Sequence, residues 1–274
     1  MKKVAPIMIE QTNPQCSEPV AAKVISGIWR VMLWNGGSLW IGCGGGRGHA
    51  HAHHAIQISL ALSGHVRLRS DENAGWSEYS GAIVLPHQRH QFYAGGESAA
   101  NIFVEPETVQ GRVLLERHTG APISSLPSET IELLVAPLRI AFAEGAGNDV
   151  LIAASQRSVA LLSGGEHAQL SVDPRITRAI EYVRSRLSNT VSLAEAAGVA
   201  HLSPSRFRHL FVAQTGISFR AYLLWARVES AVGVAMSGLS WTEAAQNCGF
   251  ADSAHLSRTC RRMFGIAPTM LIRE

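Results

Sequence analysis

The segment SLAEAAGVAHLSPSRFRHLFVAQTG, residues 192–216, decides the fold of the C-terminal part of the chain. It predicts a short alanine-rich helix, a tight turn and a second helix that begins after Ser203, because serine is a favoured N-cap and Pro204 suits the first helical position. Gly216 marks the end of the second helix, since glycine often stops a helix in the left-handed conformation. Two helices joined in this way are typical of a helix-turn-helix unit.

The same pattern returns in SWTEAAQNCGFADSAHLSRTCRRMFG, residues 240–265. Asp252 is the expected cap of its second helix and Gly265 the expected stop. Between the two units, residues 218–236 show helical spacing of apolar side chains and contain no proline, which predicts one long connecting helix. The last hundred residues, 173–274, therefore predict an all-α domain with two helix-turn-helix units.

Basic charge is concentrated in this domain. From Asp173 onward there are twelve Arg and no Lys against seven acidic residues, a net charge of +5, whereas the preceding residues carry a net charge of −2. The planar guanidinium of arginine can bind a guanine edge or a phosphate through two hydrogen bonds. A solvated helix face would explain the charge alone equally well. Together with two helix-turn-helix patterns, the charge indicates binding to double-stranded DNA.

The helical period separates the side chains that face the core from those that face DNA. We expect DNA contacts from Ser205, Arg206, Arg208 and His209 in the first recognition helix, and from Ser253, His255, Ser257, Arg258, Arg261 and Arg262 in the second. Arg261 and Arg262 lie further along their helix and suit phosphates. Arg258 has an alternative role, in which it braces the helix through a salt bridge. We expect the two recognition helices to enter successive major grooves about 34 Å apart.

These motifs resemble the DNA-binding domain of the AraC/XylS family of bacterial transcription regulators. The matching segments are residues 202–207, Gly249 with Phe250, and residues 264–268. Cys260 stands where the family usually has phenylalanine. The resemblance implies a transcription regulator, more often an activator, that acts with RNA polymerase and binds DNA as a homodimer.

Residues 24–104 show a different pattern, with short apolar runs separated by glycine and polar turns. Such runs predict the strands of an antiparallel barrel or sandwich. The expected strands are residues 27–34, 38–41, 55–62, 65–69, 81–85 and 101–104, and the expected helices that follow are residues 128–144 and 150–162. The chain is thus expected to contain a cupin-like domain at 1–162, a linker at 163–172 and the DNA-binding domain at 173–274.

Two histidine-rich segments inside the strand region resemble the cupin motifs. His51 and His53, followed by Gln57, resemble the first motif, and the segment that ends at His90 resembles the second. Many AraC/XylS regulators carry such a domain as a sensor. The resemblance therefore implies a pocket for a small organic effector, with Trp40 and the four residues just named as its expected contacts. Tryptophans on these strands, including Trp40, are alternatively core residues.

A metal site is the alternative role for the same histidines, either in a metal sensor or in a cupin enzyme with an appended DNA-binding domain. Three imidazoles would suit zinc, iron, nickel or copper. Gln57 stands where cupin enzymes usually place glutamate, and a neutral amide is a weaker ligand than a carboxylate. We therefore expect neither a metal nor another cofactor, and a regulator rather than an enzyme.

The four cysteines, Cys16, Cys43, Cys248 and Cys260, form neither a CxxC pair nor a zinc-finger spacing, so we expect reduced thiols. A redox role for Cys43 is a further alternative, although no second cysteine lies near it in sequence. The chain contains no apolar run of membrane-spanning length, and its first residues lack the apolar core of a signal peptide. We expect a cytoplasmic protein without a membrane partner.

An apolar stripe on the helix predicted at residues 128–144 suggests a contact surface. Its members are Ile131, Leu134, Val135, Leu138 and Phe142. We expect self-association through this stripe, with packing against the strands as the alternative.

Overall fold

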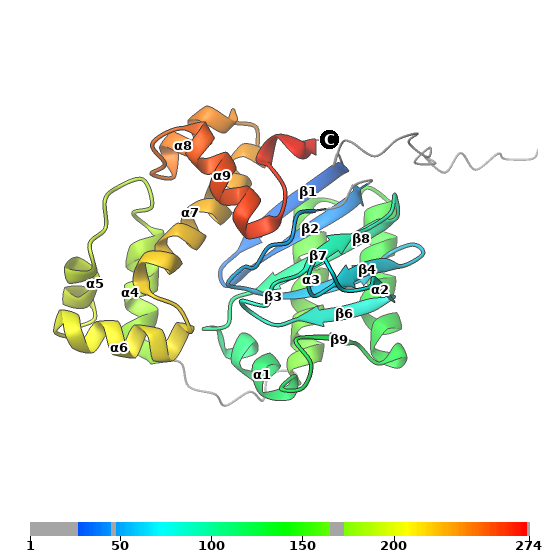
Figure 1. The fold of residues 1–274 in the computed structure, drawn as a ribbon, viewed down its shortest axis with the longest axis horizontal. Coiled ribbons are helices and arrows are strands. Elements are labelled where there is room, and N and C mark those ends of the chain that lie inside the picture. Colours follow the sequence, from blue (N-terminus) through cyan, green and yellow to red (C-terminus); the bar gives the residue numbers. More distant parts are fainter. Residues whose placement is uncertain (1–26, 45–47, 165–172, 273–274) are drawn as a thin grey trace, which may run out of the picture.

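The computed structural model describes residues 27–44, 48–164 and 173–272, and it consists of a β-rich N-terminal part and a helical C-terminal part (Figure 1). The strands are β1 (Gly27–Trp34), β2 (Gly37–Gly44), β3 (Ile56–Ala61), β4 (Val66–Arg69), β5 (Ser77–Tyr79), β6 (Gly81–Val84), β7 (Gln91–Tyr93), β8 (Ser98–Val104), β9 (Ile123–Ser125) and β10 (Leu271–Ile272). The helices are α1 (Val109–Arg117), α2 (Ser128–Ala143), α3 (Asn148–Ser163), α4 (Pro174–Arg184), α5 (Leu193–Val199), α6 (Pro204–Thr215), α7 (Phe219–Met236), α8 (Trp241–Asn247) and α9 (Ser253–Phe264), with a 3-10 turn at Pro268–Met270. No helix in this described part of the chain is long and apolar enough to cross a membrane.

The strands form two sheets. The larger has the order β10-β1-β2-β8-β3-β6-β9 and the smaller the order β5-β4-β7. All the described pairings are antiparallel except that of β10, which lies parallel to β1 with Leu271 opposite Gly27. The predicted antiparallel β-domain is confirmed, and each expected strand corresponds to an observed one. The short elements β5, β7, β9 and α1 were not predicted.

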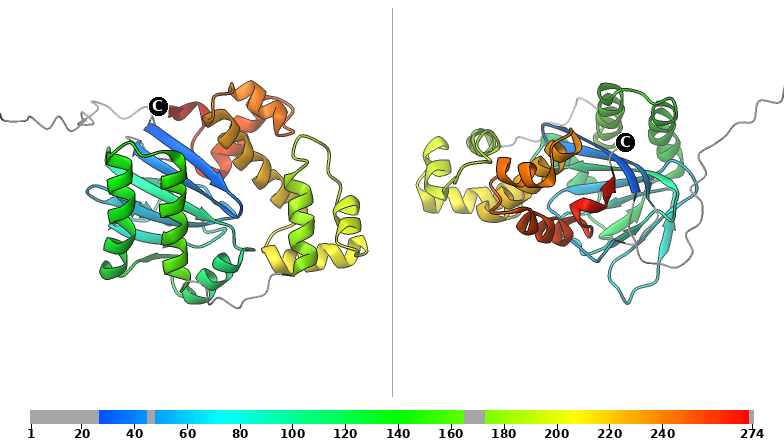
Figure 2. Two further views of the ribbon diagram at one scale, coloured as in Figure 1. Left: turned by 180° about the vertical axis from the view of Figure 1, so that it is seen from behind. Right: turned by 90° about the horizontal axis from the view of Figure 1, so that it is seen from above.

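The large sheet has two chemically different faces, because successive side chains along a strand point to opposite sides. The face toward α2 and α3 is apolar and carries Leu39, Ile41, Ile56, Ile58, Leu60 and Ile102. The opposite face mixes aromatic and polar side chains, namely Trp40, Gln57, Ser59, Asn101 and Phe103. Figure 2 shows α2 and α3 side by side over the first face, which leaves the second face for the C-terminal part.

The apolar stripe on α2 packs inside its own chain. Ile131, Leu134, Val135 and Leu138 are buried against the large sheet, and Phe142 is half-buried beside them. The prediction that this stripe mediates self-association is therefore wrong. The apolar face of the sheet needs a cover, and an amphipathic helix close by in sequence provides it.

The C-terminal part contains the two predicted helix-turn-helix units, α5–α6 and α8–α9, joined by α7. Both units begin with a capping box, in which Ser192 pairs with Glu195 and Ser240 with Glu243. The turn of the second unit needs a left-handed residue, which Gly249 supplies at φ 72°. In the first unit His201 takes the equivalent position at φ 53°.

The first boundary of the expected linker lies at the end of α3, where Ser163 is the last helical residue and Gly164 the left-handed cap. The rest of the predicted linker, residues 165–172, lies outside the described residues. The C-terminal domain is helical, as predicted, and the two-residue strand β10 near its end joins the sheet of the N-terminal part.

The two parts share one apolar core, because Trp40, Ala55 and Phe103 of the β-domain belong to the same buried cluster as the helices α4 to α9. A buried ion cluster lies at the junction. Arg184 at the end of α4 donates hydrogen bonds to the carboxylates of Glu105, which follows β8, and Glu229 on α7. Both carboxylates are buried, with side-chain exposures of 3% and 4%. Arg184 therefore joins three elements from both parts of the chain.

We expect Arg184→Met to destabilise the protein by about 3–5 kcal/mol, because it leaves two buried carboxylates without a cation. Urea unfolding of the full chain measures this loss. Arg175→Ala is the control, since Arg175 pairs with Asp173 at the surface and exposed pairs contribute little. Equal, small losses in both variants would contradict a structural role for the cluster.

Candidate DNA-binding surface and ligand cavity

The first recognition helix, α6, presents a basic face to solvent. Ser203 caps it and Gly216 ends it in the left-handed conformation, as predicted. Ser205, Arg206, Arg208 and His209 are all exposed. Phe207 and Phe211 are fully buried behind them, with ring centroids 5.4 Å apart. The structure thus places the four predicted side chains where a major groove could reach them.

The second recognition helix, α9, is capped by Asp252 and ended by Gly265. Arg258, Arg261 and Arg262 are exposed. Within the described residues Arg258 takes part in no ion pair, which argues against its alternative role as a brace. Ser253, His255 and Ser257 are half-buried, and the His255 ring packs on Phe250 at 5.1 Å. In α9, the arginines are therefore better placed for DNA than the other predicted residues.

The cores behind the two recognition helices differ. Cys260 of α9 occupies the place that Phe211 has in α6, and it is fully buried. Burial raises the pKa of the Cys260 thiol to about 12, so this cysteine is a neutral packing residue. Cys248 and Cys260 are both buried free thiols, whereas Cys16 lies outside the described residues.

A cavity of about 80 Å³ lies between the aromatic face of the large sheet and the end of the chain. Its wall on the sheet side includes Trp29, Trp40, Gln57, Asn101 and Phe103, and His51 and Phe92 also line it. The remaining wall comes from the C-terminal part, through Phe264, Ile266, Met270 and Leu271. One wall of the cavity is therefore formed by the end of the second recognition helix and the segment that follows it.

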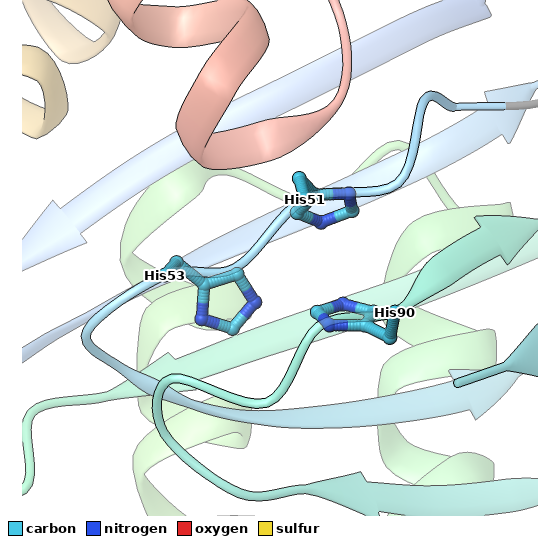
Figure 3. Close-up of side chains that lie close together, drawn as sticks. All are labelled: His51, His53 and His90. Atoms are coloured by element: carbon cyan, nitrogen blue, oxygen red, sulfur yellow. The ribbon is translucent and has the colours of Figure 1, made fainter. Parts of the chain in front are cut away.

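Three of the five predicted effector contacts, Trp40, His51 and Gln57, line this cavity. His53 and His90 do not line it, but they are buried directly beside His51, with ring centroids 5.7 and 4.3 Å away (Figure 3). Burial lowers the pKa of His53 to about 3, and it also lowers the pKa values of His51 and His90. All three imidazoles are therefore neutral at pH 7.

The end of α9 is held on the β-domain by what we call the α9 seat, formed by Phe264 and Gly265 against Trp40, His49 and Phe103. The Phe264 ring lies 4.7 Å from Trp40 and 5.7 Å from Phe103. The amide of His49 donates to the carbonyl oxygen of Gly265 at 2.8 Å. Gly265 has φ 72°, and a β-carbon there would lie 2.4 Å from the His49 carbonyl oxygen. Only glycine fits this contact without displacing the β-domain loop.

The C-terminal residues of the cavity were not predicted from the sequence. The spacing of Phe264 is that of a helix-turn-helix core residue, so the sequence gives no sign that its ring also packs on Trp40. Asn101 gave a usable signal, because a single amide inside the apolar strand β8 suggests a polar pocket. The other contacts across the cavity join the β-domain to residues far away in the sequence, and a local sequence pattern cannot predict such contacts.

A comparison with known families matches residues 193–274 to a helix-turn-helix domain. The probable transcriptional regulator LumQ of Photobacterium leiognathi is 35% identical over 89 residues, which cover 32% of this chain and 36% of LumQ. The regulatory protein PocR of Salmonella typhimurium is 29% identical over 97 residues, 35% of this chain and 32% of PocR. The chain thus matches about a third of the length of these relatives.

Among solved structures, ToxT of Vibrio cholerae O395 resembles the whole fold, with a TM-score of 0.53 and 13% identity over 90% of this chain and 96% of that one. A second ToxT structure, bound to (E)-4-(8-methylnaphthalen-1-yl)but-3-enoic acid, has a TM-score of 0.53 at 14% identity over 91% of this chain and 100% of that one. The likeness establishes a shared two-domain fold. The family match separately identifies residues 193–274 as a helix-turn-helix domain.

We expect Gly265→Ala to cost more stability than Gly216→Ala, because only the first introduces a collision. Both glycines are left-handed helix caps, so each alanine costs about 1–2 kcal/mol of backbone strain. A β-carbon at Gly216 meets only the His87 ring, at an ordinary 3.7 Å. Urea unfolding compares the two variants, and equal losses would show that the α9 seat is loose.

Proposed function

We propose that this protein is a sequence-specific DNA-binding transcription regulator, controlled by a small molecule that binds in the cavity of its N-terminal domain. The observation that carries the proposal is the wall of that cavity. It is formed partly by Phe264 and Ile266, at the end of the second helix-turn-helix unit. A molecule that fills the cavity would therefore touch the DNA-binding domain directly.

The exposed faces of α6 and α9 support DNA binding by both units. Arg208 and His209 lie in the N-terminal half of α6, the end from which a recognition helix contacts base edges. Arg261 and Arg262 lie in the last turn of α9 and suit the phosphate backbone. We infer that α6 sets the base preference and that α9 contributes more of the affinity.

The α9 seat supports a coupling between ligand and DNA. In Figure 1 the axes of α6 and α9 are not parallel. Two units that enter successive major grooves of straight DNA are related by one turn, about 34 Å, and so need similar orientations. We infer that α9 leaves its seat when both units bind DNA. An effector that prefers the seated form opposes DNA binding, and one that prefers the released form favours it.

The chemistry of the cavity suggests the class of effector. Trp29, Trp40 and Phe92 give it an aromatic wall, while Gln57 and Asn101 offer a small number of polar groups. Such a site suits a mostly apolar molecule with one hydrogen-bonding end. The ToxT structure with a bound naphthyl-butenoic acid is consistent with an effector of this kind. The regulator itself is proposed to have no catalytic role, and to act in the cytoplasm on RNA polymerase as an activator.

Self-association is proposed to use the outer side of α2 and α3, since the inner stripe is buried. Leu133 and Ile140 of α2 are 64% and 55% exposed, and they lie two helical turns apart on one face. Val150 and Leu161 of α3 are each 48% exposed. Large apolar side chains gathered on adjacent helices suit a homodimer contact.

We expect Arg208→Ala to relax base preference at one position of the site, with a loss of about 1–3 kcal/mol in discrimination. Arg262→Ala should instead weaken all sequences alike and reduce the salt dependence of binding. Selection of duplexes from a random pool, followed by competition binding, measures both effects. An unchanged base preference in Arg208→Ala would refute its assignment.

We expect the double variant Leu133→Asp with Ile140→Asp to be monomeric at concentrations where the wild type is dimeric, because two buried charges would oppose the contact. Arg139→Asp is the control, since it adds a negative charge to an exposed position of the same helix. Sedimentation velocity measures the oligomeric state. A wild type that is already monomeric, or a double variant that remains a dimer, would contradict this surface.

A further inference from the structure

The three buried histidines beside the cavity form a compact cluster. His51 and His90 pair as a short antiparallel bridge, with each amide donating to the other's carbonyl oxygen at 2.9 Å. His53 follows two residues later on the same segment as His51 (Figure 3). One ring nitrogen from each residue lies within 4.8 Å of the other two. Backbone hydrogen bonds thus hold three imidazoles around one point.

Hydrogen bonding fixes which nitrogen of each ring carries the proton. The Nδ1 atoms of His51, His53 and His90 lie 2.8–2.9 Å from the backbone carbonyl oxygens of His49, Ala55 and Gln88. A carbonyl oxygen can only accept, so each Nδ1 is the donor. A ring with one proton then carries it on Nδ1, and its Nε2 has a free lone pair. Histidines that bind metals commonly donate their other N–H to a carbonyl in this way.

Gln57 brings a fourth lone pair to the cluster. Its amide nitrogen donates to Ser59 Oγ at 2.8 Å and to Asn101 Oδ1 at 3.2 Å, which turns its Oε1 toward the histidines. That oxygen lies 2.9 Å from His53 Nε2 and 3.2 Å from His90 Nε2. When His53 and His90 carry their protons on Nδ1, each Nε2 faces Gln57 Oε1 and neither atom of the pair can donate a hydrogen bond. Unmatched polar atoms in a buried site are costly, and a cation among them would satisfy all of them.

We propose that His51, His53 and His90, with Gln57 as an oxygen ligand, bind a divalent transition-metal ion of the zinc class. Neutral imidazole is a preferred ligand of such ions, and three of them with one oxygen suit tetrahedral coordination. Zn–N bonds of about 2.0–2.1 Å require the rings to draw together by side-chain rotation. This site goes beyond the proposed DNA-binding role and does not depend on it. From the sequence we expected no metal, because the neutral amide of Gln57 is a weak ligand. In the structure, however, Gln57 Oε1 lies next to the His53 and His90 rings.

The position of the site suggests what a metal would do. His51 and Gln57 line the cavity, whereas His53 and His90 lie behind them, so the open side of the site faces the cavity. A β-carbon on Gly265 would lie 2.6 Å from His51 Nδ1, which places His51 directly under the α9 seat. This last step rests on the proposed regulatory role: a metal that moves His51 would then change the position of the end of α9.

The test uses tag-free full-length protein, because a polyhistidine tag would itself bind metal. After treatment with a chelator, the protein is titrated with Zn²⁺, and bound metal is counted by mass spectrometry after gel filtration. We expect one equivalent per chain and a rise in the unfolding temperature. His53→Asn should weaken binding at least about tenfold, while His65→Asn, at an exposed histidine, should change nothing. Cobalt adds a spectroscopic signature of the ligand set in its visible absorption.

Gln57→Glu provides a second test, which remains available if His53→Asn fails to fold. A carboxylate in place of the amide should tighten zinc binding, since it adds a negative charge at the ligand oxygen. The competing arrangement has the Gln57 amide reversed, so that its nitrogen donates to His53 and His90 and the cluster needs no cation. That arrangement predicts less than a tenth of an equivalent of bound zinc, or binding that Gln57→Glu leaves unchanged, and either result overturns the metal site. DNA binding is measured separately on a selected duplex, so failure of one proposal leaves the other standing.

Discussion

The contact between the end of α9 and the β-domain is the constraint on which the regulatory account depends. Phe264 lies against Trp40 and Phe103, and Gly265 accepts a hydrogen bond from the His49 amide. Because Phe264 also belongs to the core of the second helix-turn-helix unit, one side chain serves both the DNA-binding domain and the cavity wall. The position of the recognition helix and the shape of the cavity therefore cannot change independently.

The two faces of the large sheet have different roles: one packs on helices of the N-terminal part, and the other lies against the cavity and the C-terminal part. The apolar face is covered by α2 and α3, which gives the N-terminal part a core of its own. The other face keeps polar groups such as Gln57 and Asn101 among aromatic rings, and the C-terminal part contributes to covering them. The Arg184 cluster adds a directional contact at the same junction, since buried charges tolerate little displacement of their partners. The contact between the two parts therefore combines an apolar interface with charged groups that fix their relative position.

Much of the fold was predictable because its signals are local. Caps such as Ser192, Ser203 and Asp252 define the helix-turn-helix units within a few residues, and alternating or continuous apolar runs define the longer strands. The short strands β5, β7 and β9, of three residues each, are too short for a period to be recognised. The stripe on α2 was identified correctly as apolar but assigned to the wrong partner, because amphipathicity does not say what covers a helix.

The candidate site was predictable only in part for a different reason. Trp40, His51 and Gln57 could be chosen from motif spacing, but the wall formed by Phe264 and Leu271 joins distant parts of the chain. The protonation pattern of the histidines likewise depends on which carbonyl oxygens face their rings, and sequence alone does not show this. Exposed arginines on α6 and α9 were predictable from the helical period, whereas the orientation of the two helices relative to each other is a tertiary property.

Hydrogen exchange of the full-length protein, alone and saturated with a duplex selected from a random pool, tests the central claim most directly. The account predicts faster exchange in the segments 48–54 and 264–271 when DNA is bound, because α9 must leave its seat and the His49 amide loses its partner. Amides in the centre of the large sheet, around Ile58 and Ile102, should be unchanged. Unchanged or increased protection of residues 48–54 and 264–271 in the complex would contradict coupling through the α9 seat.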